Sequence, residues 1–183
     1  MNKIRVGKWR DDRGGPMQVV SGSTGRERVH FEAPEAQRLK KEMRNFLSWF
    51  NSKKAIDPVV VAGMAHFWFV TIHPFEDGNG RLARAIAEMC LARSENSTQR
   101  FYSMSAQIRT ERKDYYRILE ESQRGGLDIT PWLDWFLDCL ERAFHAKCSQ
   151  DSASRDIEDL LERKILIKNP GGGRSTSYSL VPV

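Results

Sequence analysis

Polar and apolar residues alternate in the segment PMQVVSGSTGRERVHF, residues 16–31. Met17 and Val19 lie before the run SGSTG, and Val29 and Phe31 lie after it, in alternation with polar residues. A period of two is the pattern of a strand, and a glycine-rich run between two such segments is typical of a turn. The pattern therefore predicts a β-hairpin over residues 16–31.

The spacing of apolar residues then changes to the helical period. Pro34 is expected to open a helix whose apolar positions are Leu39, Met43, Phe46, Leu47 and Phe50. Asp57 is the predicted N-cap of a second helix, and Pro58 is its predicted first residue. This helix, residues 58–71, is apolar nearly all round, so we expect it to be the central, buried one.

Three more helices are predicted. One begins near Gly80, with an apolar stripe made of Leu82, Ile86, Met89 and Cys90. Residues 110–124 and 130–144 are two further amphipathic segments. Thr130 followed by Pro131 is the predicted start of the last helix. Residues 1–144 are therefore interpreted as one mainly α-helical domain with an appended hairpin.

The tail, residues 145–183, has another pattern. SQDSASRDIEDLLERKILIK predicts a helix that runs into a strand, and NPGGGRSTSYSLV predicts a glycine turn and a second strand. A helix followed by a basic, glycine-rich hairpin is the second half of a winged helix-turn-helix. The first half is not visible, because HAKC supplies no preceding helices. The abrupt step at His145–Cys148 favours the hypothesis that the sequence is part of a longer chain.

Composition narrows the class of protein. Of the 183 residues, 40% are hydrophobic and 29% charged, which indicates a globular fold. No apolar run reaches the roughly 18 residues that a membrane span needs. Three cysteines without a CxxC spacing argue against a disulfide or zinc framework and favour the cytoplasm. A net charge of +5 favours anionic partners such as nucleotides or nucleic acid.

The segment TIHPFEDGNGRLAR, residues 71–84, concentrates polar chemistry between two apolar stretches. A loop formed by Gly78, Asn79 and Gly80 at a helix N-terminus presents backbone N–H groups to an anion. Arg81 and Arg84 are three residues apart, so they share one helix face and both can reach a polyphosphate.

Two further residues of this segment suggest group transfer. Asp77 is a hard oxygen ligand suited to Mg²⁺ that bridges phosphates. His73 can act as a general base near neutral pH. A histidine or a GNG turn alone is more often structural, but together these residues supply the parts for phosphoryl or nucleotidyl transfer. A Walker P-loop is absent.

The same segment resembles the signature of the Fic family, HPFx[D/E]GNGRxxR, at every position from His73 to Arg84. The resemblance covers roughly residues 5–144, including GKWR and MSAQIRTERKDYYRILEESQRG. The tail is similar to the winged-helix segment that ends many bacterial Fic proteins. The resemblance implies a Fic-type helical core with a β-hairpin flap and a partial C-terminal winged helix-turn-helix.

The resemblance also implies a protein adenylyltransferase that moves AMP from Mg-ATP to a Ser, Thr or Tyr hydroxyl, and in its full-length form also reverses that reaction. His73 would deprotonate the hydroxyl, Asp77 would hold Mg²⁺, and Phe75 would anchor the loop in the core. The expected phosphate ligands are Gly78, Asn79, Gly80, Arg81 and Arg84. Arg81 would offset charge on the leaving group, and Arg84 would meet the γ-phosphate.

Less specific expectations follow for other residues. The flap would dock a protein substrate by strand addition through Gln18, Val19, Val20 and Ser21. Tyr115 and Tyr116 are candidates for the adenine contact, the alternative being core packing. If the winged module binds DNA, the contacts would come from Ser149, Gln150, Ser152, Arg155, Arg174 and Ser175. The alternative is a dimerisation or docking module, because the predicted helix is acidic.

Several functions stay open at this point. Both glycines of the motif are retained, which favours nucleotidyl transfer over the kinase-like members, but nothing in the motif reads the base, so UTP is an alternative to ATP. No inhibitory [S/T]xxxE[G/N] segment is found, and we expect it in a missing N-terminal part. A nucleotide-sensing DNA-binding regulator and a toxin are the competing functions. A homodimer is compatible with the resemblance.

Overall fold

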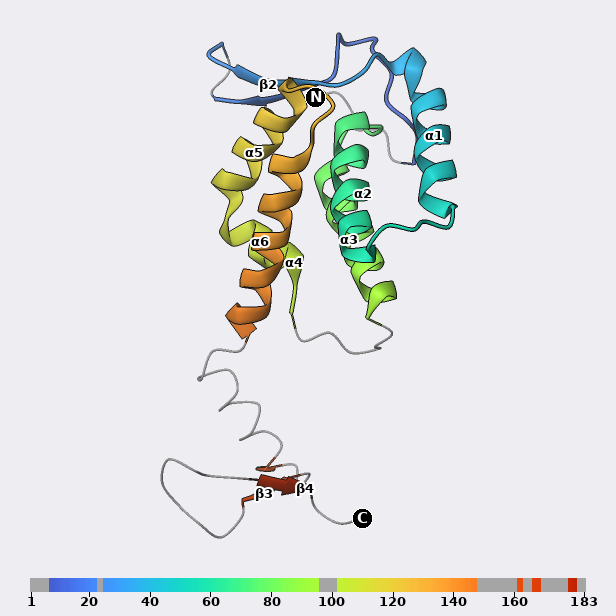
Figure 1. The fold of residues 1–183 in the computed structure, drawn as a ribbon. Coiled ribbons are helices and arrows are strands. Elements are labelled where there is room, and N and C mark those ends of the chain that lie inside the picture. Colours follow the sequence, from blue (N-terminus) through green and yellow to red (C-terminus); the bar gives the residue numbers. More distant parts are fainter. Residues whose placement is uncertain are drawn as a thin grey trace.

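The computed structural model describes residues 7–22, 25–95, 102–147, 161–162, 166–168 and 178–180. These residues form a mainly α-helical fold with two short antiparallel hairpins, as predicted (Figure 1). The elements in chain order are β1 (Gln18–Ser21), β2 (Arg28–Glu32), the 3₁₀ turn η1 (Ala36–Arg38), α1 (Leu39–Asn51), α2 (Pro58–Ile72), α3 (Asn79–Ser94), α4 (Met104–Thr110), α5 (Arg112–Arg124), α6 (Thr130–Lys147), β3 (Leu166–Lys168) and β4 (Tyr178–Leu180).

Helix α2 is the centre of the core, as its apolar sequence predicted. It lies between α1 on one side and α5 and α6 on the other, and it packs along α3 (Figure 1). Its start is also as predicted: Pro58 is the first residue, and Asp57 Oδ1 accepts a hydrogen bond from the backbone N–H of Val59 at 2.8 Å. The cap satisfies one of the N–H groups that a helix start leaves open.

A close approach between α2 and α6 holds the centre together. Trp132 is fully buried, and its indole Nε1 donates to the carbonyl oxygen of Gly63 at 2.9 Å. A Cβ at position 63 would lie 3.0 Å from Leu133 Cδ2 and 3.1 Å from Phe136 Cδ1. Glycine therefore lets the two helices approach and brings the indole within reach of the α2 backbone.

The predicted apolar stripe of α3 is partly wrong. Ile86 and Cys90 pack against the core, but Leu82 and Met89 are 42% and 38% exposed. The buried face also contains the small residues Ala83 and Ala87 and, further along, Leu91. Small side chains on this face allow α3 to pack closely along α2, and that face is rotated from the one that the larger apolar residues suggested.

The start of α1 also differs from the prediction. Pro34 does not open a helix: the chain first forms η1, and α1 begins at Leu39. The reason is that the Pro34 carbonyl and the Ala36 N–H are both bonded to the N-terminal segment, through Arg10 and Asp12.

The predicted helix at 110–124 is found as α5, Arg112–Arg124, and a further helix that the sequence analysis did not predict, α4, precedes it. Met104–Thr110 forms α4, whose N-cap Ser103 accepts from the N–H of Ala106, and α5 begins at Arg112. Helix α4 is short and mostly polar, so its periodicity was too weak to predict it.

The last helix of the body, α6, begins at Thr130 as predicted. The side chain that bonds to the backbone at its start is that of Asp128: its Oδ1 accepts a hydrogen bond from the Thr130 N–H at 2.9 Å. The helix continues through His145 to Lys147, across the start of the predicted step.

In the tail, β3 and β4 pair antiparallel, with Leu166 opposite Leu180 and Lys168 opposite Tyr178. These strands occupy the two segments that the sequence assigned to the wing. The predicted DNA contacts lie outside the described residues: Ser149, Gln150, Ser152, Arg155, Arg174 and Ser175. The winged helix-turn-helix and the division into residues 1–144 and 145–183 therefore stay predictions.

The turn between α2 and α3 places the motif. His73 ends α2 in a left-handed conformation with φ 50°, and Gly78 precedes α3 with φ 85°. The loop between these two residues is closed by the buried carboxamide of Asn79, the first residue of α3, which bonds to the Phe75 backbone. Its Oδ1 accepts from the Phe75 N–H at 2.9 Å, and its Nδ2 donates to the Phe75 carbonyl at 2.7 Å. Phe75 packs against the core, as expected.

Over the described residues, the helices are all too short or too polar to cross a bilayer.

The two cysteines of the described part of the chain, Cys90 and Cys139, are buried free thiols. Burial raises the pKa of both, and that of Cys139 to about 12, so neither is a reactive thiolate at neutral pH.

Replacing Trp132 by Phe should lower the free energy of unfolding by about 1–3 kcal/mol, because it removes the bond to Gly63 and leaves space in the core. Urea denaturation measures the change. The control is Trp9→Phe at a side chain 42% exposed, which should stay within about 0.5 kcal/mol of wild type. Equal losses in both variants would contradict this description of the core.

Asn79→Asp tests the loop closure. A carboxylate can accept from the Phe75 N–H, but only a protonated carboxyl can donate to the Phe75 carbonyl, so folding should raise the pKa of the new group. The stability deficit against wild type should be about 1–3 kcal/mol at about pH 8 and smaller at about pH 5. Urea denaturation at both pH values checks this, with exposed Asn51→Asp as the control. A deficit that grows on acidification would rule out the proposed closure.

Candidate active site

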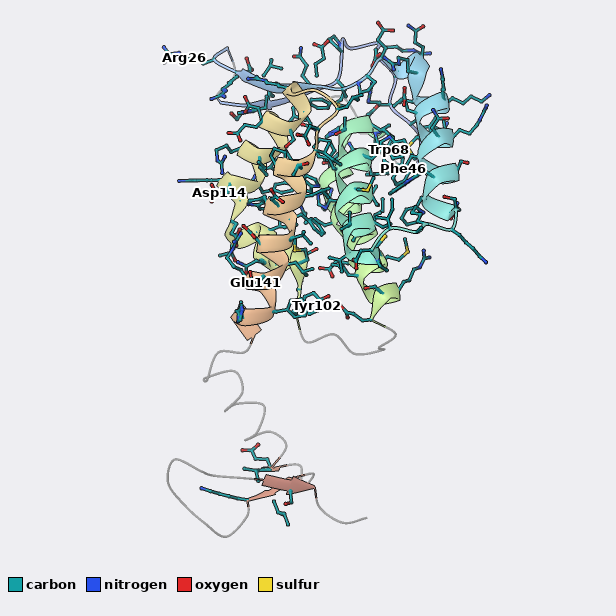
Figure 2. The ribbon with its side chains drawn as sticks, in the orientation of Figure 1. Arg26, Phe46, Trp68, Tyr102, Asp114 and Glu141 are labelled. Carbon is teal, nitrogen blue, oxygen red and sulfur yellow. The ribbon has the colours of Figure 1, made fainter. Side chains whose placement is uncertain are left out.

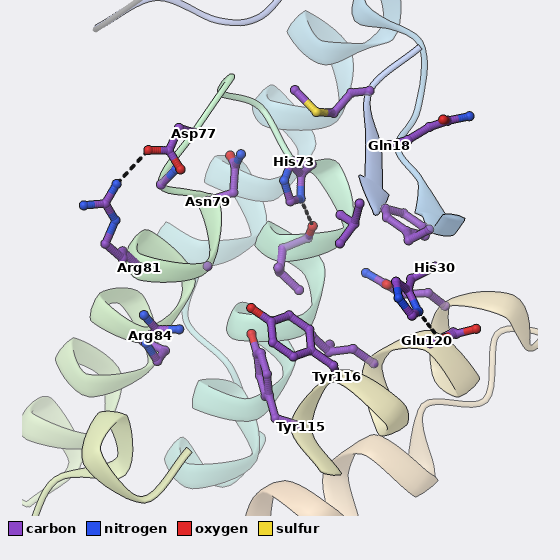
Figure 3. A pocket seen from close by; sticks show the side chains of 18 of the residues that line it. Gln18, His30, His73, Asp77, Asn79, Arg81, Arg84, Tyr115, Tyr116 and Glu120 are labelled. Atoms are coloured by element: carbon purple, nitrogen blue, oxygen red, sulfur yellow. Dashed lines mark hydrogen bonds and ion pairs between the residues drawn. The ribbon is translucent and has the colours of Figure 1, made fainter. Parts of the chain in front are cut away.

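A cavity of about 360 Å³ lies where the α2–α3 turn, the β1–β2 hairpin and α5 meet (Figure 3). It brings together the seven residues that the motif predicted: His73, Asp77, Gly78, Asn79, Gly80, Arg81 and Arg84. The hairpin contributes Gln18 and Val19, and α5 contributes Tyr115 and Tyr116. Segments far apart in the sequence thus share one concave surface, which is the usual form of a small-molecule site.

The His73 ring has the tautomer of a general base. Its Nδ1 lies 3.0 Å from the carbonyl oxygen of Val70. A carbonyl can only accept, so Nδ1 carries the hydrogen and Nε2 keeps its lone pair. The pKa of His73 is lowered, chiefly by burial and also by the charge of Arg10, while the bond to Val70 opposes the shift. The ring is therefore neutral at neutral pH and can accept a proton.

The N-terminus of α3 is built to receive an anion. Gly78 adopts φ 85°, which a side-chain-bearing residue rarely adopts, and its N–H bonds to Asp77 Oδ1. Among the described residues no side chain caps this helix end. Its first backbone N–H groups, from Asn79 to Arg81, have no partner one turn earlier in the helix and favour negative charge.

Asp77 and Arg81 form an ion pair in this structure. Arg81 Nη2 lies 2.9 Å from Asp77 Oδ2, and the two side chains are 72% and 58% exposed. The predicted metal ligand and the predicted phosphate ligand are therefore paired with each other in this structure. Such an exposed pair is worth little, so a nucleotide and its metal ion can displace it.

The donor set suits Mg²⁺ that arrives with a nucleotide. No cluster of three or more His, Cys, Asp or Glu side chains in the described part of the chain could hold a metal ion by itself. Mg²⁺ is commonly bound by one or two carboxylates together with substrate phosphates. Asp77, beside the N-terminus of α3, fits that role.

Asn79 has a structural contact that the sequence did not predict. Its carboxamide Oδ1 and Nδ2 both bond to the Phe75 backbone. The side chain thus shapes the loop, and the assignment of Asn79 to a phosphate stays a prediction.

The four predicted flap residues divide into two pairs. Gln18 and Val19 line the cavity, and Gln18 Nε2 donates to Glu32 at 2.9 Å. Val20 and Ser21 are exposed and are not part of the cavity wall. In the described residues β1 pairs only with β2, so its other edge is available to an incoming strand.

Tyr115 and Tyr116 both border the cavity but differ in exposure. Tyr115 is 2% exposed, and its hydroxyl lies 3.0 Å from Nε2 of buried His66. Burial raises the pKa of Tyr115, so the hydroxyl stays protonated. Tyr116 is 44% exposed and has Arg112 over its ring at 5.5 Å. Only Tyr116 therefore offers a ring face to a ligand.

The sequence did not predict the residues that fix the hairpin to α5. Glu120 accepts from Nδ1 of His30 and, at 2.8 Å, from Nη2 of Arg28, and it also pairs with Arg124. The bonds from His30 and Arg28 lower the pKa of Glu120 to about 2. Ninety residues separate His30 from Glu120 in the chain, so no local pattern could show the contact.

Two further residues acquire a position that the sequence did not assign. Gln123 lines the cavity and donates to Thr71 Oγ1 at 3.0 Å, which ties α5 to α2. Arg10 lies behind the His73 backbone, and its Nε donates to the His73 carbonyl at 2.8 Å. The segment GKWR was part of the family resemblance, but it carried no signal of this contact.

Comparison with known proteins agrees with the motif. A family model described as Fic/DOC family matches residues 1–91. A protein of Aedes aegypti named Protein adenylyltransferase Fic is 39% identical over 102 residues, 55% of this chain and 19% of that protein. One of the same name from Nematostella vectensis is 34% identical over 115 residues, 62% of this chain and 25% of that protein. The chain thus spans about a quarter or less of these relatives' length.

Solved structures support the fold. A Fic family protein from Desulfovibrio desulfuricans G20 superposes with a TM-score of 0.63 at 22% identity, over 97% of this chain and 63% of that one. A Fic domain containing signaling protein from Bacteroides thetaiotaomicron VPI-5482 superposes with a TM-score of 0.58 at 26% identity, over 76% of this chain and 53% of that one. Residues 1–91, which contain the hairpin, the left-handed histidine and the turn between α2 and α3, form a Fic/DOC family domain.

Proposed function

We propose that this chain transfers AMP from Mg-ATP to a hydroxyl group of a protein. One observation carries the proposal: a neutral histidine with a free Nε2 and the uncapped N-terminus of α3 line the same cavity. A base and an anion site at one place are the two requirements for activating a hydroxyl against a phosphate. The relatives named Protein adenylyltransferase Fic support the choice of AMP as the transferred group.

The chemical step balances with the residues present. The hydroxyl oxygen forms a bond to the α-phosphorus, the bond from that phosphorus to the bridging oxygen breaks, and pyrophosphate leaves. The hydroxyl proton passes to Nε2 of His73. The hydrogen bond from Nδ1 to Val70 keeps the ring oriented during this transfer.

We assign the binding of the negatively charged phosphates to the start of α3. The backbone N–H groups from Asn79 to Arg81 would hold the phosphate oxygens, and Arg84, half-buried on the same helix face, would take the terminal phosphate. Arg81 would turn from Asp77 to the leaving group. Mg²⁺ held by Asp77 would supply charge neutralisation on the phosphates.

The acceptor would reach the site along the hairpin. A target segment that adds to the open edge of β1 would lie beside Gln18 and Val19, which border the cavity that contains His73. Strand addition uses backbone bonds, so a Ser, Thr or Tyr hydroxyl would all be compatible with this docking.

The nucleotide base would lie at the α5 side of the cavity. Tyr116 offers its ring for stacking, and Leu119 and Gln123 border the same region. This surface favours a planar ring but does not by itself select adenine, so UTP remains the alternative donor. The same cavity could also serve the removal of AMP, in which water attacks the phosphorus of the AMP–protein ester and the protein hydroxyl leaves.

A nucleotide-sensing DNA-binding regulator is the competing function. Such a sensor needs an anion site but no proton acceptor. The observed His73, with its pKa lowered and Nε2 free, favours the enzyme.

Incubation with Mg²⁺ and α-phosphate-labelled ATP in a cell lysate should label at least one protein. His73→Ala should lower the labelling rate by about 10²-fold or more, because the base is lost. The matched control is His145→Ala, at an exposed histidine of α6, which should label like wild type. Equal labelling by His73→Ala would refute the assignment of the base, and labelling from UTP but not ATP would change the donor.

The pH dependence of kcat/KM follows from the lowered pKa of His73 in the free protein. The neutral ring is the active form, so kcat/KM should be half-maximal at a pH below 6.5, the ordinary pKa of histidine. Initial rates at Mg-ATP concentrations well below KM measure the profile, and His145→Gln should not change it. A half-maximal rate above pH 6.5 would contradict the burial of the base.

A further inference from the structure

Arg10 contacts two parts of the chain that meet behind the candidate active site: the turn at His73–Pro74 and the segment at Pro34. Its Nε donates to the His73 carbonyl at 2.8 Å, and its Nη2 donates to the carbonyl of Pro34. Its own backbone N–H donates to the carbonyl of Pro74 at 2.9 Å. The side chain is 1% exposed, so these bonds are shielded from water.

A buried guanidinium needs a compensating charge, and Asp12 supplies it. Arg10 Nη1 lies 2.8 Å from Asp12 Oδ1. The other oxygen of Asp12 accepts from the N–H of Ala36 at 2.6 Å. Burial lowers the pKa of Arg10, but Asp12 opposes the shift and the group stays charged. The pair thus joins the N-terminal segment to the chain that follows the hairpin.

The backbone at His73 is where such support is required. Among the described residues His73 is the only non-glycine residue with a positive φ. A left-handed conformation costs a side-chain-bearing residue about 1–2 kcal/mol and persists only where its surroundings hold it. Arg10 holds the carbonyls of both His73 and Pro74, which fix the direction of the chain at this point.

The same contacts relate the base to the hairpin. Pro34 follows β2, which ends at Glu32, and Ala36 starts η1. Arg10 and Asp12 bond to both positions, so the exit of the hairpin and the turn at His73 are held by one buried pair.

We propose that Arg10 is a positioning residue for the transfer reaction: it holds the left-handed backbone of His73 and fixes the base relative to the hairpin that docks the target. The inference rests on the proposed function. It concerns alignment of the base and not affinity for the nucleotide, because the N-terminus of α3 is shaped by the hydrogen bonds between the Asn79 carboxamide and the Phe75 backbone, in which Arg10 takes no part.

Two variants separate the geometry from the charge. Arg10→Lys keeps a cation but loses the planar fork that reaches two carbonyls and a carboxylate at once. Arg10→Met removes both the cation and the planar fork. The matched control is Arg142→Gln, which breaks a two-bond pair with Glu111 outside the cavity. The other charged and titratable groups around the cavity stay unchanged: His30, Glu76, Asp77, Arg81, Arg84, Tyr115, Tyr116 and Glu120.

The readout that does not depend on activity is the ¹H–¹³C NMR signal of the His73 ring, titrated with pH and assigned by its loss in His73→Ala. Both variants should shift this signal. In Arg10→Met the pKa of His73 should rise toward the ordinary value, because the neighbouring charge is gone, and in Arg10→Lys it should stay lowered. The Arg142→Gln control should leave signal and pKa unchanged.

The kinetic readout is kcat against KM for Mg-ATP. Arg10→Met should lower kcat by about 10²-fold, as expected for a displaced base, with KM changed by less than about threefold. Arg10→Lys decides the matter if Arg10→Met does not fold, and it should lower kcat with the same small change in KM.

An unchanged His73 signal in Arg10→Lys, or an equal change in Arg142→Gln, would overturn the proposal. If wild type transfers no AMP but the signal responds as expected, the positioning role stands and the proposed function fails.

Discussion

The hydrogen bonds between the Asn79 carboxamide and the Phe75 backbone are the contact on which the site depends. They fold the turn between α2 and α3 so that the end of one helix and the start of the next line one cavity. The end of α2 supplies a proton acceptor, and the start of α3 supplies an electropositive surface. The closure uses a buried side chain and backbone groups only, so it does not engage the side chains of Asp77, Arg81 and Arg84.

The rest of the molecule keeps this turn at a fixed place. The close contact of α2 with α6, allowed by Gly63, positions the helix that ends at His73. Figure 2 shows how densely the side chains fill the space between these helices and α1, where Phe46 packs with Trp68. Glu120 holds the hairpin on α5, which fixes the strand proposed to dock a target relative to the wall proposed to hold a nucleotide base.

The sequence predicted what depends on local pattern. The hairpin, the cap at Asp57, the buried α2 and the meeting of the motif residues in one cavity are all found in the structure. It did not predict contacts between distant segments, such as Arg10 with His73 or His30 with Glu120, because no periodicity links residues so far apart. The stripe of α3 was partly wrong since close packing against α2 selects alanines, and the hydrogen bonds of the Asn79 carboxamide were not predicted because their partner, the Phe75 backbone, has no sequence signal.

The most direct test of the account is a crystal structure of this chain with Mg²⁺ and a non-hydrolysable ATP analogue. The account predicts phosphates on the backbone N–H groups at the start of α3, an opened Asp77–Arg81 pair, and Nε2 of His73 facing the α-phosphate across a space that admits a hydroxyl group. A nucleotide bound elsewhere, or one whose α-phosphate lies away from His73, would contradict it.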